Sequence, residues 1–406
     1  MKTAALLAPE QALRIILDQI EPLGSERLAL REAYGRLLSE EIFAGENLPQ
    51  FDCSAMDGYA VRAQDTTGAL LDSPSALRLV GEQSAGKSDA TPVSPHSAVR
   101  IMTGAPLPPG ADAVVMVEDT SCSDGLVYSY REVSAGVNVR RAGEDVGADS
   151  RVLSRGVRLG AAEMGLLAAL GRAIVPVYRR PTVALITTGD EIVAVSERPG
   201  PGQIRDANQY SLLGQVLACG AAVTLCERVP DDPAVLRRAV TTAAARADLV
   251  ITSGGVSVGD YDFVKDVLGE LGEILFWQVA IKPGQPLAFG QIAGKPLFGL
   301  PGNTVSSMVT FDLFVRPALL QLAGSTALGH PLVSGQVMQF IRHAPGRREY
   351  VRATATWHQG CYLARPTGDQ GPGRISSMLG ANSYIIVPET CGDLSAGEMV
   401  EIMLFS

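Results

Sequence analysis

Three loops in the second half of the chain concentrate glycines, hydroxyl groups and carboxylates, each directly after a short apolar run. They are Thr187–Glu191, Thr252–Asp262 and Leu300–Thr304. In an open parallel sheet, the carboxyl ends of the strands meet at one edge, and ligands bind there. Glycines let backbone N–H groups approach a phosphate closely, and a helix N-terminus adds a favourable partial charge. Together the loops predict a site for a ligand that carries phosphate.

The carboxylates of these loops indicate a divalent metal ion beside that ligand. Asp190, Glu191, Asp260 and Asp262 offer oxygen ligands, and Mg²⁺ prefers one or two carboxylates together with water and substrate phosphates. Roles as helix caps or as solvated loop charges stay open for each of them. None of the three loops matches GxxxxGK[ST], and the first strand–helix turn lacks GxGxxG, which disfavours an ordinary nucleotide hydrolase or dehydrogenase.

Basic residues are sparse in the chain overall, so Lys282 stands out. It follows an expected strand and precedes a Pro/Gly turn, which would place its ammonium group at the same rim, where it could anchor an anion. A solvated surface lysine is the alternative. Further anion contacts could come from Arg140, Arg141, Arg347, Arg348 and Arg352. The four histidines lie far apart without a metal-binding or triad pattern, and we expect packing or surface roles for them.

The elements that must position these loops alternate between strand and helix across residues 178–327. Such alternation is typical of a doubly wound, mostly parallel α/β domain. The expected strands lie near 183–186, 221–225, 249–251, 274–280, 286–289 and 296–299. The expected helices include 213–217, 232–246, 262–271 and a long one from Asn303.

The remainder of the chain divides into smaller parts. Short β-type runs between Gly, Pro and Asp turns predict a small β-rich domain at 46–145 and a C-terminal β domain at 328–406. Residues 1–45 and 146–177 are expected to form an extended N-terminal and linking helical region that serves dimerisation. Its helices are expected at 9–21, 30–40 and 161–170. The sequence therefore predicts a multidomain α/β protein.

Composition limits the class of protein and of partner. Of 406 residues, 46% are hydrophobic and 19% charged, which is enough apolar material for buried cores. The net charge of −9 disfavours nucleic-acid binding, which needs a basic surface. The six cysteines are scattered without a CxxC pair, and the N-terminal apolar run is too short for a signal peptide. Because no run of about 18 uncharged apolar residues exists, no membrane span is expected. We expect a cytoplasmic protein without a nucleic-acid or membrane partner.

Several motifs, in order along nearly the whole chain, resemble those of the molybdopterin molybdenumtransferase family. They are Phe51–Val61, Met102–Pro106, Gly143–Asp145, Thr188–Glu191, Ser253–Ser257, Ile281–Gly284 and Gly299–Asn303. The resemblance extends to the C-terminal domain of gephyrin-type eukaryotic proteins. It implies the last step of molybdenum cofactor synthesis, in which molybdate is inserted into the dithiolene of adenylylated molybdopterin, AMP is released and Mg²⁺ is required.

The resemblance also implies roles for individual residues. Those implied in catalysis are Asp57, Thr103, Asp145, Glu191, Asp231, Asp262 and Lys282. Those implied in binding molybdopterin or molybdate are Thr188, Gly189, Ser253, Gly254, Gly255, Ser257, Pro301, Gly302, Asn303, Arg352 and Ser376. Asp57, Glu191 and Asp262 are implied as metal ligands.

The quaternary structure and three departures complete what the resemblance implies. The family's site is thought to form between the β-rich domain of one subunit and the α/β and last domains of the other, which implies a homodimer. Gln278 and Gln285 stand where lysines are frequent, and Cys53 stands where asparagine is common. At Gln278, the side chain could face solvent, or Arg347 or Arg348 could replace the missing charge.

Two other functions stay open at this point. A gephyrin-like scaffold would use its last domains to hold a peptide. A molybdopterin adenylyltransferase has a similar α/β domain but lacks the N-terminal β region that carries Asp57 and Thr103. For the transferase itself, molybdopterin adenylyltransferase and molybdoenzyme-maturation proteins are the expected partners.

Overall fold

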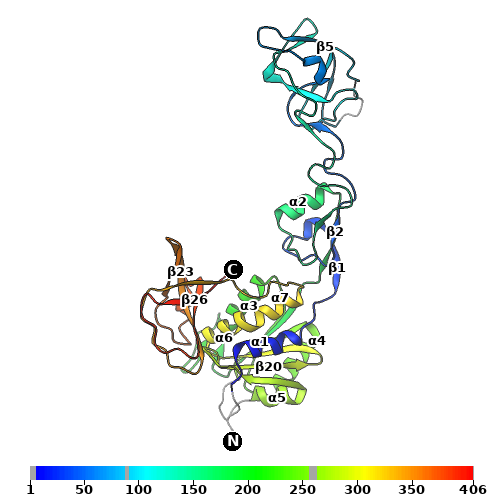
Figure 1. The fold of residues 1–406 in the computed structure, drawn as a ribbon. Coiled ribbons are helices and arrows are strands. Elements are labelled where there is room, and N and C mark those ends of the chain that lie inside the picture. Colours follow the sequence, from blue (N-terminus) through cyan, green and yellow to red (C-terminus); the bar gives the residue numbers. More distant parts are fainter. Residues whose placement is uncertain (1–5, 87–90, 256–262, 406) are drawn as a thin grey trace. The chain divides into compact units, whose positions relative to one another are not determined.

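The computed structural model describes residues 6–86, 91–255 and 263–405 (Figure 1). The chain forms two compact units. Unit 1 comprises residues 1–27, 35–39 and 176–406, and unit 2 comprises residues 28–34 and 40–175. Each unit has sheets and hydrophobic cores of its own. The four-part division expected from the sequence stays a prediction.

Unit 1 contains a six-stranded sheet that carries the three loops singled out above. Its order is β16-β13-β17-β21-β20-β18. The first four of these strands are parallel, and β20 and β18 extend the sheet in antiparallel fashion. The strands are β13 (Thr182–Thr188), β16 (Ala222–Val229), β17 (Leu249–Ser253), β18 (Gly272–Gln278), β20 (Pro286–Ile292) and β21 (Lys295–Leu300). The α/β fold class is thereby confirmed.

Helices cover both faces of this sheet, as a doubly wound domain requires. Because neighbouring side chains of a strand point to opposite faces, Leu185 packs with α1, α3, α6 and α7, whereas Ile186 packs with α4 and α5. Asp232 Oδ1 accepts the backbone N–H groups of Ala234 and Val235 at 2.7 and 2.9 Å and so caps α4, the helix expected at 232–246. The helices are α1 (Pro9–Asp18), α3 (Asn208–Ala218), α4 (Pro233–Arg246), α5 (Phe263–Leu271), α6 (Thr304–Thr310) and α7 (Arg316–Leu322).

A continuous helical run, Thr304–Leu322, joins α6 to α7 through a π-helical turn, η4 (Phe311–Val315). Within the described ranges it is the one helix long and apolar enough to cross a membrane by length and composition, and 78% of that stretch is buried inside the protein, as in a core helix. Its buried Asp312 accepts hydrogen bonds from Tyr384 Oη at 2.7 Å and from Gln215 Nε2 at 2.8 Å. Burial raises the pKa of Asp312 to about 6.

Replacing Asp312 by asparagine should stabilise the protein at alkaline pH. Because folding raises the pKa of Asp312, the stability that this carboxyl group contributes is complete below its unfolded value of 3.8 and is lost as the pH rises through about 6. The amide keeps an acceptor for Tyr384 without a charge. We expect the free energy of unfolding, measured by chemical denaturation, to rise by about 1–3 kcal/mol at about pH 8 and to change little near pH 4.

The control for this prediction is Asp312→Leu, which removes both acceptor atoms and should destabilise at either pH because Tyr384 and Gln215 lose a buried partner. If Asp312→Asn leaves the free energy of unfolding at alkaline pH unchanged, the ionised carboxylate does not destabilise the folded protein.

A second six-stranded sheet forms the C-terminal part of unit 1. Its order is β19-β23-β24-β22-β26-β25, and β23 also pairs with β25, so five of the strands close on themselves. The short β19 runs parallel to β23, which joins the chain leaving β18 to this sheet. The strands are β19 (Ile281–Lys282), β22 (Leu332–Val337), β23 (Arg348–His358), β24 (Cys361–Pro366), β25 (Ser383–Val387) and β26 (Met399–Leu404). A 3₁₀ turn, η5 (Ile375–Met378), precedes β25.

Unit 2 is built around a sheet in the order β7-β4-β6-β5-β9-β8. Its strands are β4 (Gly58–Val61), β5 (Ser75–Gln83), β6 (Ser97–Ile101), β7 (Ala113–Met116), β8 (Thr120–Ser123) and β9 (Leu126–Ser129). Shorter pieces are β2 (Ile42–Phe43), β3 (Cys53–Ser54), β10 (Val139–Arg140), β11 (Arg151–Leu153), the helix α2 (Ala161–Ala169) and the 3₁₀ turns η2 (Ala63–Thr66) and η3 (Val117–Asp119). β1 (Ser25–Ala29) pairs with β12 (Ile174–Tyr178).

The helix expected at 30–40 is wrong. One 3₁₀ turn, η1 (Leu30–Glu32), forms there, and Gly35 with φ +75° turns the chain away. Backbone groups that a helix would pair internally bond elsewhere instead: Ser39 N–H donates to Pro176 O, and Leu37 O accepts from Tyr178 N–H. The helical spacing of the apolar residues was a misleading signal here. Tyr34 lies on the face that was expected to be buried, yet it is 69% exposed.

Candidate functional site

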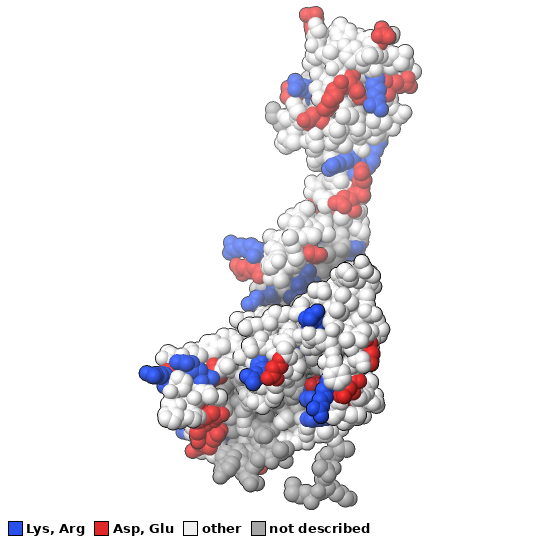
Figure 2. Space-filling view, turned by 90° about the vertical axis from the view of Figure 1, so that its left-hand side faces the viewer, with Lys and Arg blue, Asp and Glu red and all other residues white. Residues whose placement is uncertain are grey.

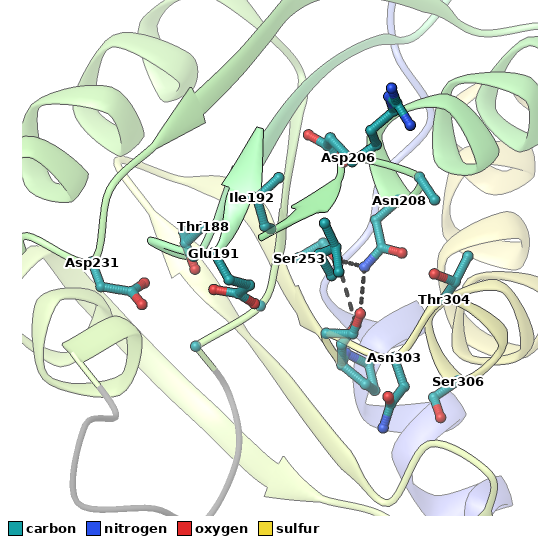
Figure 3. Close-up of a pocket in the computed structure, with 18 of the residues that line it drawn as sticks. Thr188, Glu191, Ile192, Asp206, Asn208, Asp231, Ser253, Asn303, Thr304 and Ser306 are labelled. Carbon is teal, nitrogen blue, oxygen red and sulfur yellow. Dashed lines mark hydrogen bonds between the residues drawn. The ribbon is translucent and has the colours of Figure 1, made fainter. Parts of the chain in front are cut away.

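The carboxyl ends of β13, β17 and β21 surround a cavity of about 480 Å³ in unit 1 (Figure 3). The three loops predicted to converge do so, as the parallel register of these strands requires. Ten residues named from the sequence lie on the cavity wall: Thr188, Gly189, Glu191, Asp231, Ser253, Gly254, Gly255, Pro301, Gly302 and Asn303. The wall also contains Ile192, Ile204, Arg205, Asp206, Ala207, Asn208, Pro286, Thr304 and Ser306.

A hydrogen-bond network centred on Asn208 holds one side of the cavity. Asn208 Nδ2 donates to Ser253 Oγ at 2.8 Å and to Gly302 O at 2.7 Å, as the dashed lines in Figure 3 mark. The start of α3 is thus tied to the end of β17 and to the turn after β21. Sequence reasoning missed Asn208, because the helix expected at 213–217 in fact begins at Asn208, five residues earlier.

Glycines bring backbone close to backbone on the opposite side. Gly254 has φ +97°, and a Cβ atom there would stand 2.5 Å from Thr188 O. Gly255 has φ +64°, and its Cβ would stand 2.4 Å from Val264 Cγ2. Thr188 Oγ1 is buried and has no hydrogen-bond partner within the described ranges. The wall therefore offers a buried hydroxyl group beside backbone that only glycine allows.

Carboxylates gather at one end of the cavity. Asp231 N–H donates to Asp190 Oδ1 at 3.1 Å, and the Glu191 carboxylate lies over Gly189. Partial burial raises the pKa of Asp231, and the negative charges of Asp190 and Glu191 raise it further. Asp260, Asp262 and Ser257 lie outside the described residues. No three His, Cys, Asp or Glu side chains within those residues form a complete metal cluster.

Lys282 does not line this cavity. Its Nζ pairs with Glu349 Oε1 at 3.0 Å, and the loop that follows it reaches the wall at Pro286. Within this loop, Gln285 Oε1 accepts a hydrogen bond from Arg347 Nη1 at 2.9 Å. A guanidinium group therefore stands beside the position where the resemblance leads one to expect a lysine.

Arg348 points elsewhere. It forms ion pairs with Glu10 and with Glu389, whose Oε2 lies 3.0 Å from Arg348 Nε. Of the two arginines proposed from the sequence as replacements for a missing charge, Arg347, and not Arg348, contacts the loop after Lys282, through Gln285.

Arg352, predicted as a binding residue, is 1% exposed and lies outside the cavity wall. Its Nε donates to Ser377 Oγ at 3.1 Å and its Nη2 to Gly371 O at 3.2 Å, so it supports the loop that carries Ser376. Desolvation lowers the pKa of Arg352. Ser376 itself is exposed, in η5.

That loop reaches the start of α6, since Val305 N–H donates to Pro372 O at 3.2 Å. Ser376 thus belongs to a segment in contact with the helix whose first residues line the cavity.

In unit 2, the structure brings together Asp57 and Thr103. Asp57 Oδ1 accepts the backbone N–H of Thr103 at 2.7 Å and its hydroxyl at 2.8 Å, and these bonds lower the pKa of Asp57. Asp145 lies on another loop of unit 2, with its N–H donated to Leu48 O at 3.1 Å.

Family models match three stretches of the chain: MoeA N-terminal region (domain I and II) over residues 7–171, probable molybdopterin binding domain over 184–321, and MoeA C-terminal region (domain IV) over 335–405. A molybdopterin molybdenumtransferase of Haemophilus influenzae is 39% identical over 407 residues, covering 99% of each chain. The chain belongs to the MoeA family. The predicted resemblance is thereby confirmed.

Other MoeA relatives agree with this membership. A molybdopterin molybdenumtransferase of Bacillus subtilis is 36% identical, covering 97% of this chain and 93% of the relative. A gephyrin of Dictyostelium discoideum is 32% identical over 97% of this chain and 62% of its own length. A solved molybdopterin biosynthesis moeA protein from Pyrococcus horikoshii OT3 superimposes with a TM-score of 0.84 at 32% identity, covering 98% of this chain and 100% of that one.

Proposed function

We propose that this MoeA-family chain is a molybdopterin molybdenumtransferase, which inserts molybdate into adenylylated molybdopterin and releases AMP. The observation that carries the assignment is the full-length similarity to transferases of that name, together with a cavity at the strand ends where ten expected residues meet. Purified protein supplied with adenylylated molybdopterin, Mg²⁺ and molybdate should release AMP. A molybdopterin adenylyltransferase would instead consume ATP, so the same assay separates the two enzymes.

The cavity suits a substrate that joins a pterin to a pyrophosphate and an adenylate. Its volume of about 480 Å³ lies in the range of small-molecule sites. Glycines at positions 254 and 255 allow close approach of a phosphate to the backbone, and the Thr188 hydroxyl, which has no partner among the described residues, can donate to one of its oxygens. Asn208 keeps Ser253 and Gly302 in place while the substrate enters.

The acidic end of the cavity fits a bound Mg²⁺. Glu191 and Asp231 on the wall, with Asp190 beside Asp231, offer oxygen atoms alone. Burial first, and then the negative charges of Asp190 and Glu191, raise the pKa of Asp231, and a bound cation would stabilise its charged form. Because the described residues do not form a complete ligand cluster, the ion would keep water molecules and take substrate phosphate oxygens. When bound, Mg²⁺ would neutralise phosphate charge, and Glu191 and Asp231 would hold the ion.

Glu191→Gln should raise the Mg²⁺ concentration needed for half-maximal AMP release by about tenfold, the effect of losing one charged ligand worth about 1.4 kcal/mol. A Mg²⁺ titration at fixed ionic strength measures it. Glu197→Gln is the control, since Glu197 is exposed and lies off the cavity wall. A Mg²⁺ requirement that is the same in both variants removes Glu191 from the metal site.

We also propose a cytoplasmic homodimer that receives its substrate from a molybdopterin adenylyltransferase and passes its product to molybdoenzyme-maturation proteins. Nucleic acid and membranes are not expected as partners. The net charge of −9 disfavours binding to nucleic acid, and on the face drawn in Figure 2 basic and acidic side chains are interspersed. Sedimentation of the purified protein tests the dimer.

A further inference from the structure

A buried carboxylate, Glu349 on β23, holds two side chains from different elements of unit 1. Its Oε1 lies 3.0 Å from Lys282 Nζ on β19, and its Oε2 lies 2.8 Å from His343 Nδ1. Side-chain exposure is 6% for Glu349, 1% for His343 and 45% for Lys282. Of these three side chains, Lys282 is thus the one that is substantially exposed to solvent.

The environment of His343 defines its part. Its backbone N–H donates to Asp393 Oδ1 at 2.7 Å, which fixes the residue from a third loop. Its Nε2 is buried and has no hydrogen-bond partner among the residues that the structure describes. His343 Nδ1 thus holds one oxygen of the Glu349 carboxylate, and the other oxygen faces Lys282.

Stability alone does not account for this arrangement. An ion pair with a half-exposed lysine contributes little to the free energy of folding, whereas burying a carboxylate carries a desolvation cost. What the arrangement achieves is to restrict a long, flexible side chain. The parallel pairing of Lys282 with Glu349 fixes the backbone, and the carboxylate, held by His343, fixes the ammonium group.

The position of Lys282 explains why restricting its side chain would matter for function. The loop that begins at Lys282 ends at Pro286 on the cavity wall, and Arg347, which precedes β23, donates a hydrogen bond to Gln285 of this loop. Two cations thus accompany the segment that enters the wall, where an anionic substrate would meet them. A fixed ammonium group binds an oxyanion with less loss of side-chain freedom than a mobile one.

We propose that Glu349, oriented by His343, is a positioning residue that fixes the Lys282 ammonium group for the oxyanion substrate of the reaction. The proposal rests on the proposed transferase function. Neither Glu349 nor His343 is expected to contact substrate. Their removal should weaken the binding of molybdate more than it slows turnover at saturation.

The kinetic test compares matched carboxylate variants. Glu349→Gln should raise the KM for molybdate by about tenfold with a smaller change in kcat, as expected for loss of one charge-assisted contact. Glu349→Asp should recover part of the loss. Glu389→Gln, which removes one of the two ion pairs of Arg348 outside the cavity, is the control and should leave both constants unchanged. His343→Asn retains a donor to Glu349 and should be milder than His343→Phe.

A second measurement does not depend on activity. The chain contains five lysines, Lys2, Lys87, Lys265, Lys282 and Lys295. After reductive ¹³C-methylation, the Lys282 signal, assigned with Lys282→Arg, should be broad in the wild-type protein and narrow in Glu349→Gln. An equally narrow signal in both proteins would overturn the positioning role, as would an unchanged molybdate KM in Glu349→Gln when Lys282→Gln is impaired. Failure of the wild-type protein to release AMP would instead refute the proposed function. The NMR result would still test whether Glu349 fixes the Lys282 side chain.

Discussion

Asp57→Asn should reduce AMP release by at least about 100-fold while the protein stays folded. The expected size is that of removing a group that moves a proton or stabilises charge at the reacting atoms. Asp57 is exposed, and asparagine Oδ1 can accept the same two bonds from Thr103, so the local backbone loses nothing. Because those bonds lower the pKa of Asp57, the wild-type carboxylate stays ionised throughout neutral and mildly acidic assays.

AMP release by the purified variant, with thermal unfolding to verify the fold, measures this effect. Asp72→Asn is the control, since it replaces another exposed carboxylate of unit 2. Full activity of Asp57→Asn would exclude the carboxylate from catalysis. If two subunits of a homodimer share each site, mixing Asp57→Asn with Lys282→Gln should restore part of the activity through heterodimers, and no recovery after subunit exchange would contradict a shared site.

Gly254→Ala should abolish activity through the backbone. At φ +97° an alanine is strained by about 1–3 kcal/mol, and its Cβ would stand 2.5 Å from Thr188 O. The Thr188 oxygen is a backbone atom of β13. Relieving this contact therefore requires the end of β13 or β17 to move, which displaces the walls of the cavity. We expect AMP release to fall by at least about 100-fold, since small displacements of a positioned substrate cost that much.

Substrate binding and the free energy of unfolding both report on this variant. Gly269→Ala is the matched control, because nothing lies within 4 Å of its Cβ position in the exposed part of α5. It should stabilise by about 0.5–1 kcal/mol. Wild-type activity in Gly254→Ala would show that the cavity wall adapts to a side chain there.

The sequence was sufficient for features that depend on neighbouring residues. The short apolar run of β13 and the helix that begins near Asp232 could be read from the sequence because their signals lie in neighbouring residues. The convergence of three loops followed from one topological rule. The helix at 30–40 failed because its backbone partners, near Pro176, lie more than a hundred residues away.

The contacts of the site were harder to predict for the same reason. Lys282 stood out in the sequence, but its partner Glu349 comes 67 positions later and becomes adjacent only when β19 pairs with β23. Arg352 carries a charge that suggested an exposed binding role, whereas its β23 position faces the protein interior. Burial of a charged side chain is decided by the sheet around it and leaves no mark in the local sequence.

The π-helical turn at Phe311–Val315 sets the rotational phase between the two halves of one helix. The half before it presents Thr304 and Ser306 to the cavity, and Asp312 within it meets Tyr384. A regular α-helix advances about 100° per residue, so deleting one residue from this turn would rotate α6 by roughly that angle against α7. The cavity would then lose the two hydroxyl groups although no residue that lines it had been changed. The exact number of residues in this buried turn is thus as much a determinant of the substrate site as the side chains on its wall.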